Sequence, residues 1–80
     1  MDINLVIASY LYAVREEHNL TQEKMAEIID VSVRWYQSIE TGRNVPNFKV
    51  ICLLVKSFDL DLRYLLREVT YNDLLQTTQR

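Results

Sequence analysis

The sequence predicts an all-α domain, and three observations carry that prediction. Of the 80 residues, 49% are hydrophobic, yet the chain holds one glycine and one proline. A sandwich of many strands and turns would use those two residues more often. Apolar residues recur at helical spacing, and residues suited to capping stand before several of these runs. A chain of this length buries one modest core, so we expect a single domain.

The first predicted helix begins near residue 3 and ends near His18. Either Asp2 or Asn4 can cap its start, and Asn19 tolerates the left-handed conformation that often ends a helix. Leu5, Ser9 and Tyr12 lie toward the side that faces away from the core. The inward stripe consists of Ile3, Ile7, Tyr10, Leu11 and Val14.

Residues 20–42 are typical of two short helices joined by a tight turn. Thr21 can cap the first of them, since its hydroxyl can accept a backbone N–H of the first turn. Asp30 tolerates the left-handed region, so it suits the turn. The second helix begins after Ser32 and ends before Gly42, the residue expected just past a helix end. This spacing indicates a helix-turn-helix, although a plain helical hairpin would give the same pattern.

The second helix of this motif has two different sides when it is drawn as a wheel. Ser32, Trp35, Tyr36 and Ile39 fall on the side that can pack inward. The other side offers a guanidinium for guanine, an amide for adenine and an aliphatic group for the thymine methyl, as major-groove reading requires. The alternative is an ordinary solvated face, which would usually carry more Glu and Lys. The outward set is Val33, Arg34, Gln37, Ser38 and Thr41.

A fourth helix is predicted from Phe48 to about Ser57, with Asn47 as its cap and Pro46 marking the loop before it. Asp61 can cap a fifth helix. We expect the core side of the fourth helix to consist of Phe48, Ile51, Cys52, Leu54 and Val55. The apolar residues of the fifth helix are Leu62, Tyr64, Leu65 and Leu66.

An apolar pattern continues beyond the fifth helix, either as an extension of it or as a sixth short helix. We therefore divide the chain into a helix-turn-helix domain, residues 1–68 with its motif at 21–42, and a C-terminal extension, residues 69–80. The last five residues are polar and are expected to fray. Apolar residues beyond a minimal domain need cover, which a two-fold partner supplies economically. These residues are Val69, Tyr71, Leu74 and Leu75.

The net charge of −2 counts against nucleic-acid binding, because most such domains have a basic footprint. Local placement decides the field at a groove, however. Arg34, Arg43 and Lys49 lie in or beside the candidate DNA-binding face, with Lys24 nearby. We therefore expect modest affinity per monomer and a dependence on dimerisation.

The residue inventory argues against other classes of protein. A single cysteine, Cys52, excludes an intramolecular disulfide and a cysteine-based metal site, and we expect it to be a buried thiol. His18 is the only histidine, and no glycine loop or facing carboxylate pair suggests catalysis. We expect no enzyme, cofactor, metal or small-molecule ligand. Without a signal peptide or a membrane-length apolar run, a cytoplasmic location is expected.

Several motifs spread along residues 11–66 then become informative together: Leu20-Thr21-Gln22-Glu23, Val31-Ser32, Ile39-Glu40-x-Gly42-Arg43, Pro46 and Leu65-Leu66. This distributed pattern resembles the lambda-repressor-like (Cro/CI, or Xre) family of helix-turn-helix proteins. The resemblance implies a compact five-helix domain that binds double-stranded operator DNA, usually as a homodimer. It also implies that an arginine at position 15 reaches a glutamate at position 40, clamping the first helix to the recognition helix.

The residues can now be assigned expected roles. Base reading falls to Val33, Arg34, Gln37 and Ser38. The Arg15–Glu40 pair is expected to be structural, unless the two are unrelated surface charges. Gln22 either holds a phosphate, as the resemblance implies, or is an inert polar residue at a helix start. The expected phosphate contacts are Gln22, Ser32, Arg43, Asn44, Asn47 and Lys49.

Two functions follow from this assignment. The leading one is a sequence-specific transcriptional regulator, a repressor that occludes polymerase, with the second motif helix in the major groove. The alternative is a protein-interaction or antitoxin-like adaptor on the same fold with little DNA affinity. The acidic balance and Trp35 favour the alternative. We expect Trp35 to pack under the neighbouring helix, but its indole N–H can also reach a phosphate, or its ring can cover a protein partner.

Overall fold

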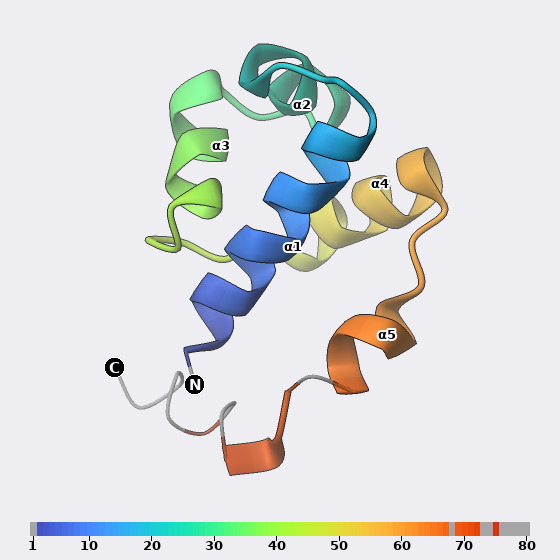
Figure 1. Cartoon of the computed structure of the whole chain (residues 1–80). Helices are drawn as coiled ribbons and strands as arrows, with labels where there is room; N and C mark the ends of the chain where they lie inside the picture. Colours follow the sequence, from blue (N-terminus) through green and yellow to red (C-terminus); the bar gives the residue numbers. More distant parts are fainter. Residues whose placement is uncertain (1, 68, 73–74, 76–80) are drawn as a thin grey trace.

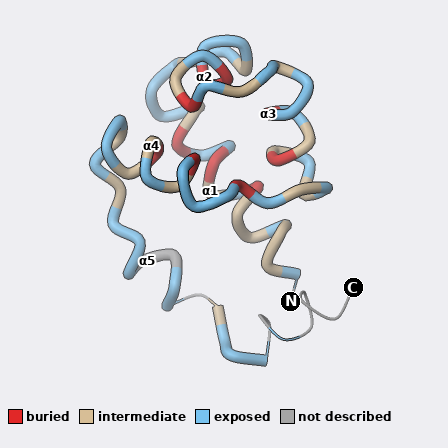
Figure 2. The backbone as a smooth tube through the Cα atoms, turned by 180° about the vertical axis from the view of Figure 1, so that it is seen from behind, coloured by how far each residue is buried: buried red, intermediate tan, exposed pale blue. Residues whose placement is uncertain are grey.

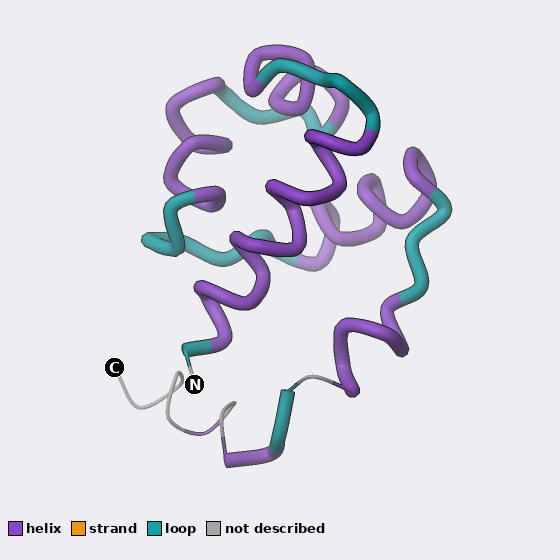
Figure 3. Tube along the Cα trace, in the orientation of Figure 1, coloured by secondary structure: helices purple, strands orange, loops and turns teal. Residues whose placement is uncertain are grey.

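The computed structural model describes residues 2–67, 69–72 and 75, and over these residues the chain is all-α with no strand. Short loops join most of the helices, and a longer one separates the third helix from the fourth (Figure 3). The helices, in the order shown in Figure 1, are α1 (Ile3–Glu17), α2 (Gln22–Ile28), α3 (Val33–Glu40), α4 (Phe48–Phe58) and α5 (Leu62–Arg67).

A side chain caps the start of each of the helices α1 to α4. The caps are Asp2, Thr21, Ser32 and Asn47, and each accepts a hydrogen bond of 2.9–3.0 Å from a backbone N–H two or three residues further along. Between the two candidates for α1, the structure selects Asp2. These bonds satisfy backbone donors that a helix start leaves without an intrahelical partner, which explains why the helices begin where they do.

Left-handed residues end the helices that precede the turns. Asn19, Asp30 and Asp59 have φ values of 55°, 58° and 53°, and Gly42 has φ 83°. Asn and Asp tolerate this region better than other side chains do, and glycine enters it without steric cost. The predicted breaks after α1, between α2 and α3, after α3 and after α4 are therefore confirmed.

The core lies where the first four helices meet. The helix α3 packs against both α1 and α2, and α2 also packs against α4. In Figure 2 the buried segments face the centre that these helices enclose. The buried cluster consists of Leu11, Met25, Ala26, Ile29, Tyr36, Ile39, Val50 and Leu54.

Two predictions for α4 are wrong. Phe48 is 78% exposed and Cys52 is exposed, although both were expected to face the core. The buried residues of α4 are Val50 and Leu54, one helical turn apart. Phe48 and Cys52 each lie two residues from a buried position, which rotates them by about 200° to the opposite side of the helix.

The residues that follow α5 do not form one continuous helix with it. Val69 and Thr70 are not helical, whereas Tyr71 and Asn72 are. Of the two alternatives for the extension, a separate short helical segment therefore agrees better with the structure. The predicted boundary at residue 68, the apolar position Leu74 and the polar tail at residues 76–80 lie outside the described residues.

The loop after α3 depends on Gly42. A larger residue there could destabilise the fold in two ways, through a clash with the side chain of Leu5 and through backbone strain at the positive φ. A Cβ atom added there would lie 2.7 Å from Cδ2 of Leu5, but that side chain is 54% exposed and can move. The positive φ cannot be relieved in this way. We therefore predict that Gly42→Ala lowers the free energy of unfolding by about 1–2 kcal/mol, mainly through backbone strain.

Urea unfolding of Gly42→Ala, Leu5→Ala and the double variant measures the two costs separately. Backbone strain predicts that the double variant loses about as much as the two single variants together. Recovery of stability when Leu5 is truncated would show instead that the side-chain contact sets the cost.

Candidate nucleic-acid interface

Fewer residues of α3 face the core than the sequence predicted. Tyr36 and Ile39 are fully buried, but Trp35 is 43% exposed and Ser32 is exposed, so the expectation that these two residues turn inward is wrong. Trp35 directly precedes Tyr36, which places it about 100° around the helix from the core. Its large ring therefore stands on the surface next to the expected reading face.

Val33 was expected on the outward side of α3, and this expectation is also wrong. The residue is half-buried and packs against the core cluster, because it lies three residues before Tyr36 on the same stripe of the helix. The outward face of α3 therefore begins at Arg34, and only the exposed part of the Val33 side chain remains available to a ligand.

The outward face of α3 and the loop after it form an open hollow of about 600 Å³, the α3 hollow. Trp35 and Thr41 also line it. Thr41 was expected on this outward side of the helix, and a contact to phosphate or to a protein partner was the alternative to packing for Trp35. Six of the predicted DNA-contact residues meet there: Ser32, Arg34, Gln37, Ser38, Arg43 and Asn44.

The other predicted contacts lie outside the α3 hollow. Asn47 uses its side chain to cap α4. Lys49 lies 3.8 Å from Asp30, and because both side chains are largely exposed this ion pair adds little stability. Gln22 does not line the hollow, but its amide oxygen accepts a hydrogen bond of 3.0 Å from Nε2 of Gln37, which does.

Ser38 holds the loop against the helix. Its hydroxyl donates to the carbonyl of Trp35 at 2.6 Å and accepts from Nδ2 of Asn44 at 3.0 Å. The backbone N–H groups of Arg43 and Asn44 both donate to the Ser38 carbonyl. Since the one hydroxyl proton of Ser38 is already in use, this side chain can offer a ligand only an acceptor.

A partly buried carboxylate, Glu40, ties α3 to the rest of the domain. Arg15 donates to it in a bidentate pair, Nε to Oε2 and Nη2 to Oε1, each at 2.9 Å. Gln22 donates to Oε1 at 3.0 Å, and the Tyr36 hydroxyl donates to Oε2. The sequence analysis placed Tyr36 only in the core, although its spacing of four residues from Glu40 was a signal for this bond.

These donors keep Glu40 ionised. Its burial alone would raise its pKa, but the hydrogen bonds from Arg15, Tyr36 and Gln22 outweigh that cost and hold the pKa below the ordinary value of 4.5. Burial and the bond to the carboxylate raise the pKa of Tyr36, and the bond to Glu40 raises the pKa of Arg15. At neutral pH the cluster therefore consists of one anion, one cation and a neutral phenol.

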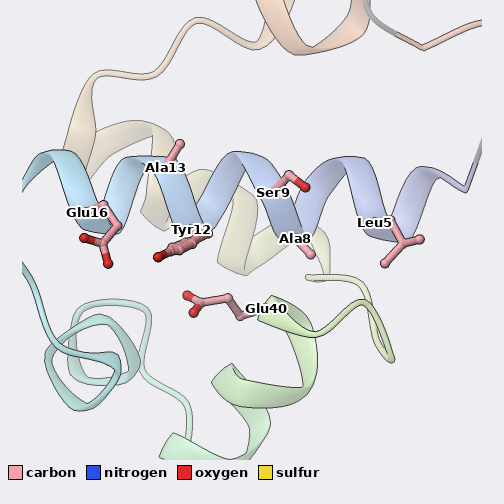
Figure 4. Close-up of a pocket in the computed structure, with 7 residues that line it drawn as sticks. All are labelled: Leu5, Ala8, Ser9, Tyr12, Ala13, Glu16 and Glu40. Atoms are coloured by element: carbon pink, nitrogen blue, oxygen red, sulfur yellow. The ribbon is translucent and has the colours of Figure 1, made fainter.

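A second hollow, of about 510 Å³, lies along α1 where Glu40 of α3 approaches it (Figure 4), and its lining has a different charge. In Figure 4 Glu40 projects from α3 toward α1, and Glu16 lies further along the same hollow. The lining contains these two carboxylates and no Lys or Arg, whereas the lining of the α3 hollow contains Arg34 and Arg43 and no carboxylate. Arg15 neutralises Glu40, so the stronger electrostatic contrast comes from the two arginines: a polyanion would be attracted to the α3 hollow and would meet no cation in the lining of the one on α1.

The described part of the chain lacks two further kinds of feature, a metal-binding cluster and a membrane-length helix. It contains no group of three or more His, Cys, Asp or Glu side chains placed to hold a metal ion. None of its helices has both the length and the hydropathy that spanning a bilayer demands.

The order of the helices and the basic face of α3 define a helix-turn-helix protein. A helix-turn-helix family model matches residues 11–65, which is more than half of the chain. The protein belongs to this Cro/CI-type helix-turn-helix family.

Comparison with solved structures agrees at the level of the fold. The crystal structure of the clp gene regulator ClgR from Corynebacterium glutamicum superposes with a TM-score of 0.72 at 19% identity, covering 96% of this chain and 82% of that one. Among curated protein sequences no match was found.

The Glu40 cluster predicts a destabilisation that depends on pH. Arg15→Met removes the bidentate donor and leaves a carboxylate whose side chain is only 9% exposed, so we expect a loss of about 2–4 kcal/mol at pH 7. Because the native pKa of Glu40 is below 4.5, the stabilisation from ionised Glu40 is present above that pH and is lost on acidification. The difference between the two proteins should therefore shrink as the pH falls.

Urea unfolding of both proteins at several pH values checks this expectation. Arg63→Met is a suitable control, since Arg63 pairs with Asp61 on the surface, and it should change stability little at any pH. A loss for Arg15→Met that stays the same from pH 7 down to the most acidic pH at which both proteins still fold would show that the charge on Glu40 is not its source.

Proposed function

We propose that this protein is a sequence-specific, DNA-binding transcriptional regulator that places α3 in the major groove. The observation that carries the proposal is the α3 hollow, where Arg34 on α3 and Arg43 in the loop after it stand without a carboxylate, while the opposite side of α3 is fixed in the core. Membership of the helix-turn-helix family supports this reading. The structural neighbour is itself described as a gene regulator, which agrees with it.

Within this proposal the base-reading side chains differ in what they can offer. Arg34 has no hydrogen bond or ion pair within the described residues, so its guanidinium is free to bind guanine O6 and N7. Gln37 offers an amide to adenine, and Ser38 offers an acceptor. The exposed part of Val33 suits a thymine methyl group.

Phosphate contacts would flank these readers. The guanidinium of Arg43 is likewise without a partner in the described residues, and Gln22 keeps a second amide proton after its bond to Glu40. Contacts of this kind fix the register of the protein on the duplex and carry little sequence information. The remaining proposed phosphate contacts are Ser32, Asn44, Asn47 and Lys49.

We further propose that the protein acts as a homodimer on a palindromic operator and represses by occluding polymerase. In this scheme residues 1–68 form the five-helix DNA-binding domain, and residues 69–80 form an extension that contributes to the dimer.

One observation favours the alternative of a protein-interaction or antitoxin-like adaptor. Trp35 exposes a large aromatic surface in the α3 hollow, and tryptophan is enriched at the centres of protein interfaces. The net charge of −2 also lowers the expected affinity for a polyanion.

Selection of bound sequences from random duplex DNA first identifies the operator. Measuring the affinity for this operator at several salt concentrations then distinguishes the two functions. A DNA-reading protein should lose affinity steeply with salt, with a log–log slope of about −0.9 for each phosphate that it neutralises. A set of four phosphate contacts would thus give a slope of about −3.6. Binding that is weak and independent of salt, without an enriched sequence, would support the adaptor.

Arg34 provides a more local prediction. Arg34→Ala should weaken operator binding by about 1–3 kcal/mol and relax the preference at one base pair, because a bidentate contact to guanine is lost. Arg43→Ala is the matched control from the same hollow, and it should weaken all sequences alike and make the salt slope shallower by about 1 for each protomer bound. Equal weakening of all sequences by Arg34→Ala would remove Arg34 from the base readers.

A further inference from the structure

A chain of three hydrogen-bonded side chains leads from the buried ion pair to the surface of the α3 hollow. Glu40 accepts from Nε2 of Gln22 at 3.0 Å, and Oε1 of Gln22 accepts from Nε2 of Gln37, also at 3.0 Å. Gln22 is partly buried, whereas Gln37 is exposed and lines the hollow. The buried charge is therefore linked through one amide to a proposed base-reading residue.

The charge of Glu40 fixes the orientation of both amides. An ionised carboxylate can only accept hydrogen bonds, so Gln22 must turn its NH₂ group toward Glu40 and its oxygen away. That oxygen can only accept in turn, so Gln37 must meet it with an N–H. What remains for a ligand is the oxygen of Gln37 and its second N–H, in one fixed order.

We propose that Gln22 and Glu40 are positioning residues that set the Gln37 amide to recognise adenine. Adenine presents an acceptor, N7, beside a donor, the N6 amino group, and a glutamine amide binds both at once. An amide held in one orientation favours this pair over guanine, which presents two acceptors. The proposal rests on the proposed DNA-binding function and adds how one base preference is built into the free protein.

Another proposed base-reading residue on this face, Arg34, serves as a control for the proposal. Arg34 lies on the same face of α3 without a partner in the described residues, so its base preference should not depend on Gln22 or Glu40. Tyr36 provides a second control, because its hydroxyl also bonds to Glu40 but lies outside the chain of amides.

The decisive variant is Gln22→Met, which keeps the length of the side chain but removes both hydrogen bonds. Gln37→Met first identifies the base pair that Gln37 reads, by measuring binding to operators substituted at each position. Gln22→Met should then lower the preference for adenine at that pair by about three- to tenfold, part of the discrimination of a bidentate contact. The preference at the pair read by Arg34 should remain unchanged.

Combining the substitutions tests whether the two residues act together. In the Gln37→Met background, Gln22→Met should cause no further change in preference at that pair. Glu40→Gln, whose amide can turn either way, should reduce the adenine preference as Gln22→Met does. Tyr36→Phe, which removes a bond to the same carboxylate, should retain it. Circular dichroism confirms that each variant is folded.

A readout in the free protein complements these measurements. The side-chain amide resonances of Gln37 should shift in Gln22→Met and in Glu40→Gln, but little in Tyr36→Phe. Unchanged resonances in Gln22→Met would overturn the proposal, because Gln37 would then not be held by Gln22.

The DNA measurements distinguish the failure of this proposal from failure of the proposed function. If Gln22→Met weakens all sequences alike and the adenine preference persists, Gln22 is a phosphate contact only, and the protein is still a DNA-reading regulator. If the unmodified protein shows neither a preferred sequence nor a salt-dependent affinity, the proposed function itself is wrong, and the positioning role falls with it.

Discussion

The bond between Arg15 and Glu40 is the interaction on which the arrangement of this domain depends. A helix as short as α3 has little stability of its own, so its position must come from packing and from contacts to other helices. Burying two charges is costly, and the cost is offset only when the geometry and the further hydrogen bonds are good. Here Arg15 binds both carboxylate oxygens and also donates to the backbone carbonyl of Leu20, while α2 and α3 supply two more donors.

The same cluster explains how an acidic chain can present a basic face. Glu40 is turned inward and neutralised by Arg15, so it does not reach the α3 hollow. Glu16 lines the hollow along α1 and not the α3 hollow, and the exposed Glu27 is paired with Lys24. A net charge of −2 therefore coexists with a hollow whose charged side chains are both arginines, because the field near a ligand follows the local arrangement of charge.

The sequence predicts local features well and the phases of the helices less well. The caps and the left-handed turns depend on one or two residues each, and they are found where predicted. Trp35 was misplaced because α3 has only 8 residues and too few apolar positions to fix its rotation. Phe48 was misplaced for the opposite reason, because α4 is apolar around most of its circumference. In both cases the neighbouring helices decide which side is buried. The amide chain through Gln22 joins α2 to α3, and no spacing along one helix could reveal it.

The proposed reading face combines fixed and free side chains, and this division would have consequences for binding. Ser38 and Gln37 are held by hydrogen bonds before any ligand arrives, so ordering them on binding costs little conformational entropy. Arg34 and Arg43 lose that freedom only in the complex, at a cost of the order of 0.5–1.5 kcal/mol for each side chain. Under the proposed function, sequence preference would come from the two held side chains and from the guanidinium of Arg34. Arg43 would add affinity through phosphate, an attraction that weakens with salt, so a change at Arg43 alters affinity without altering preference.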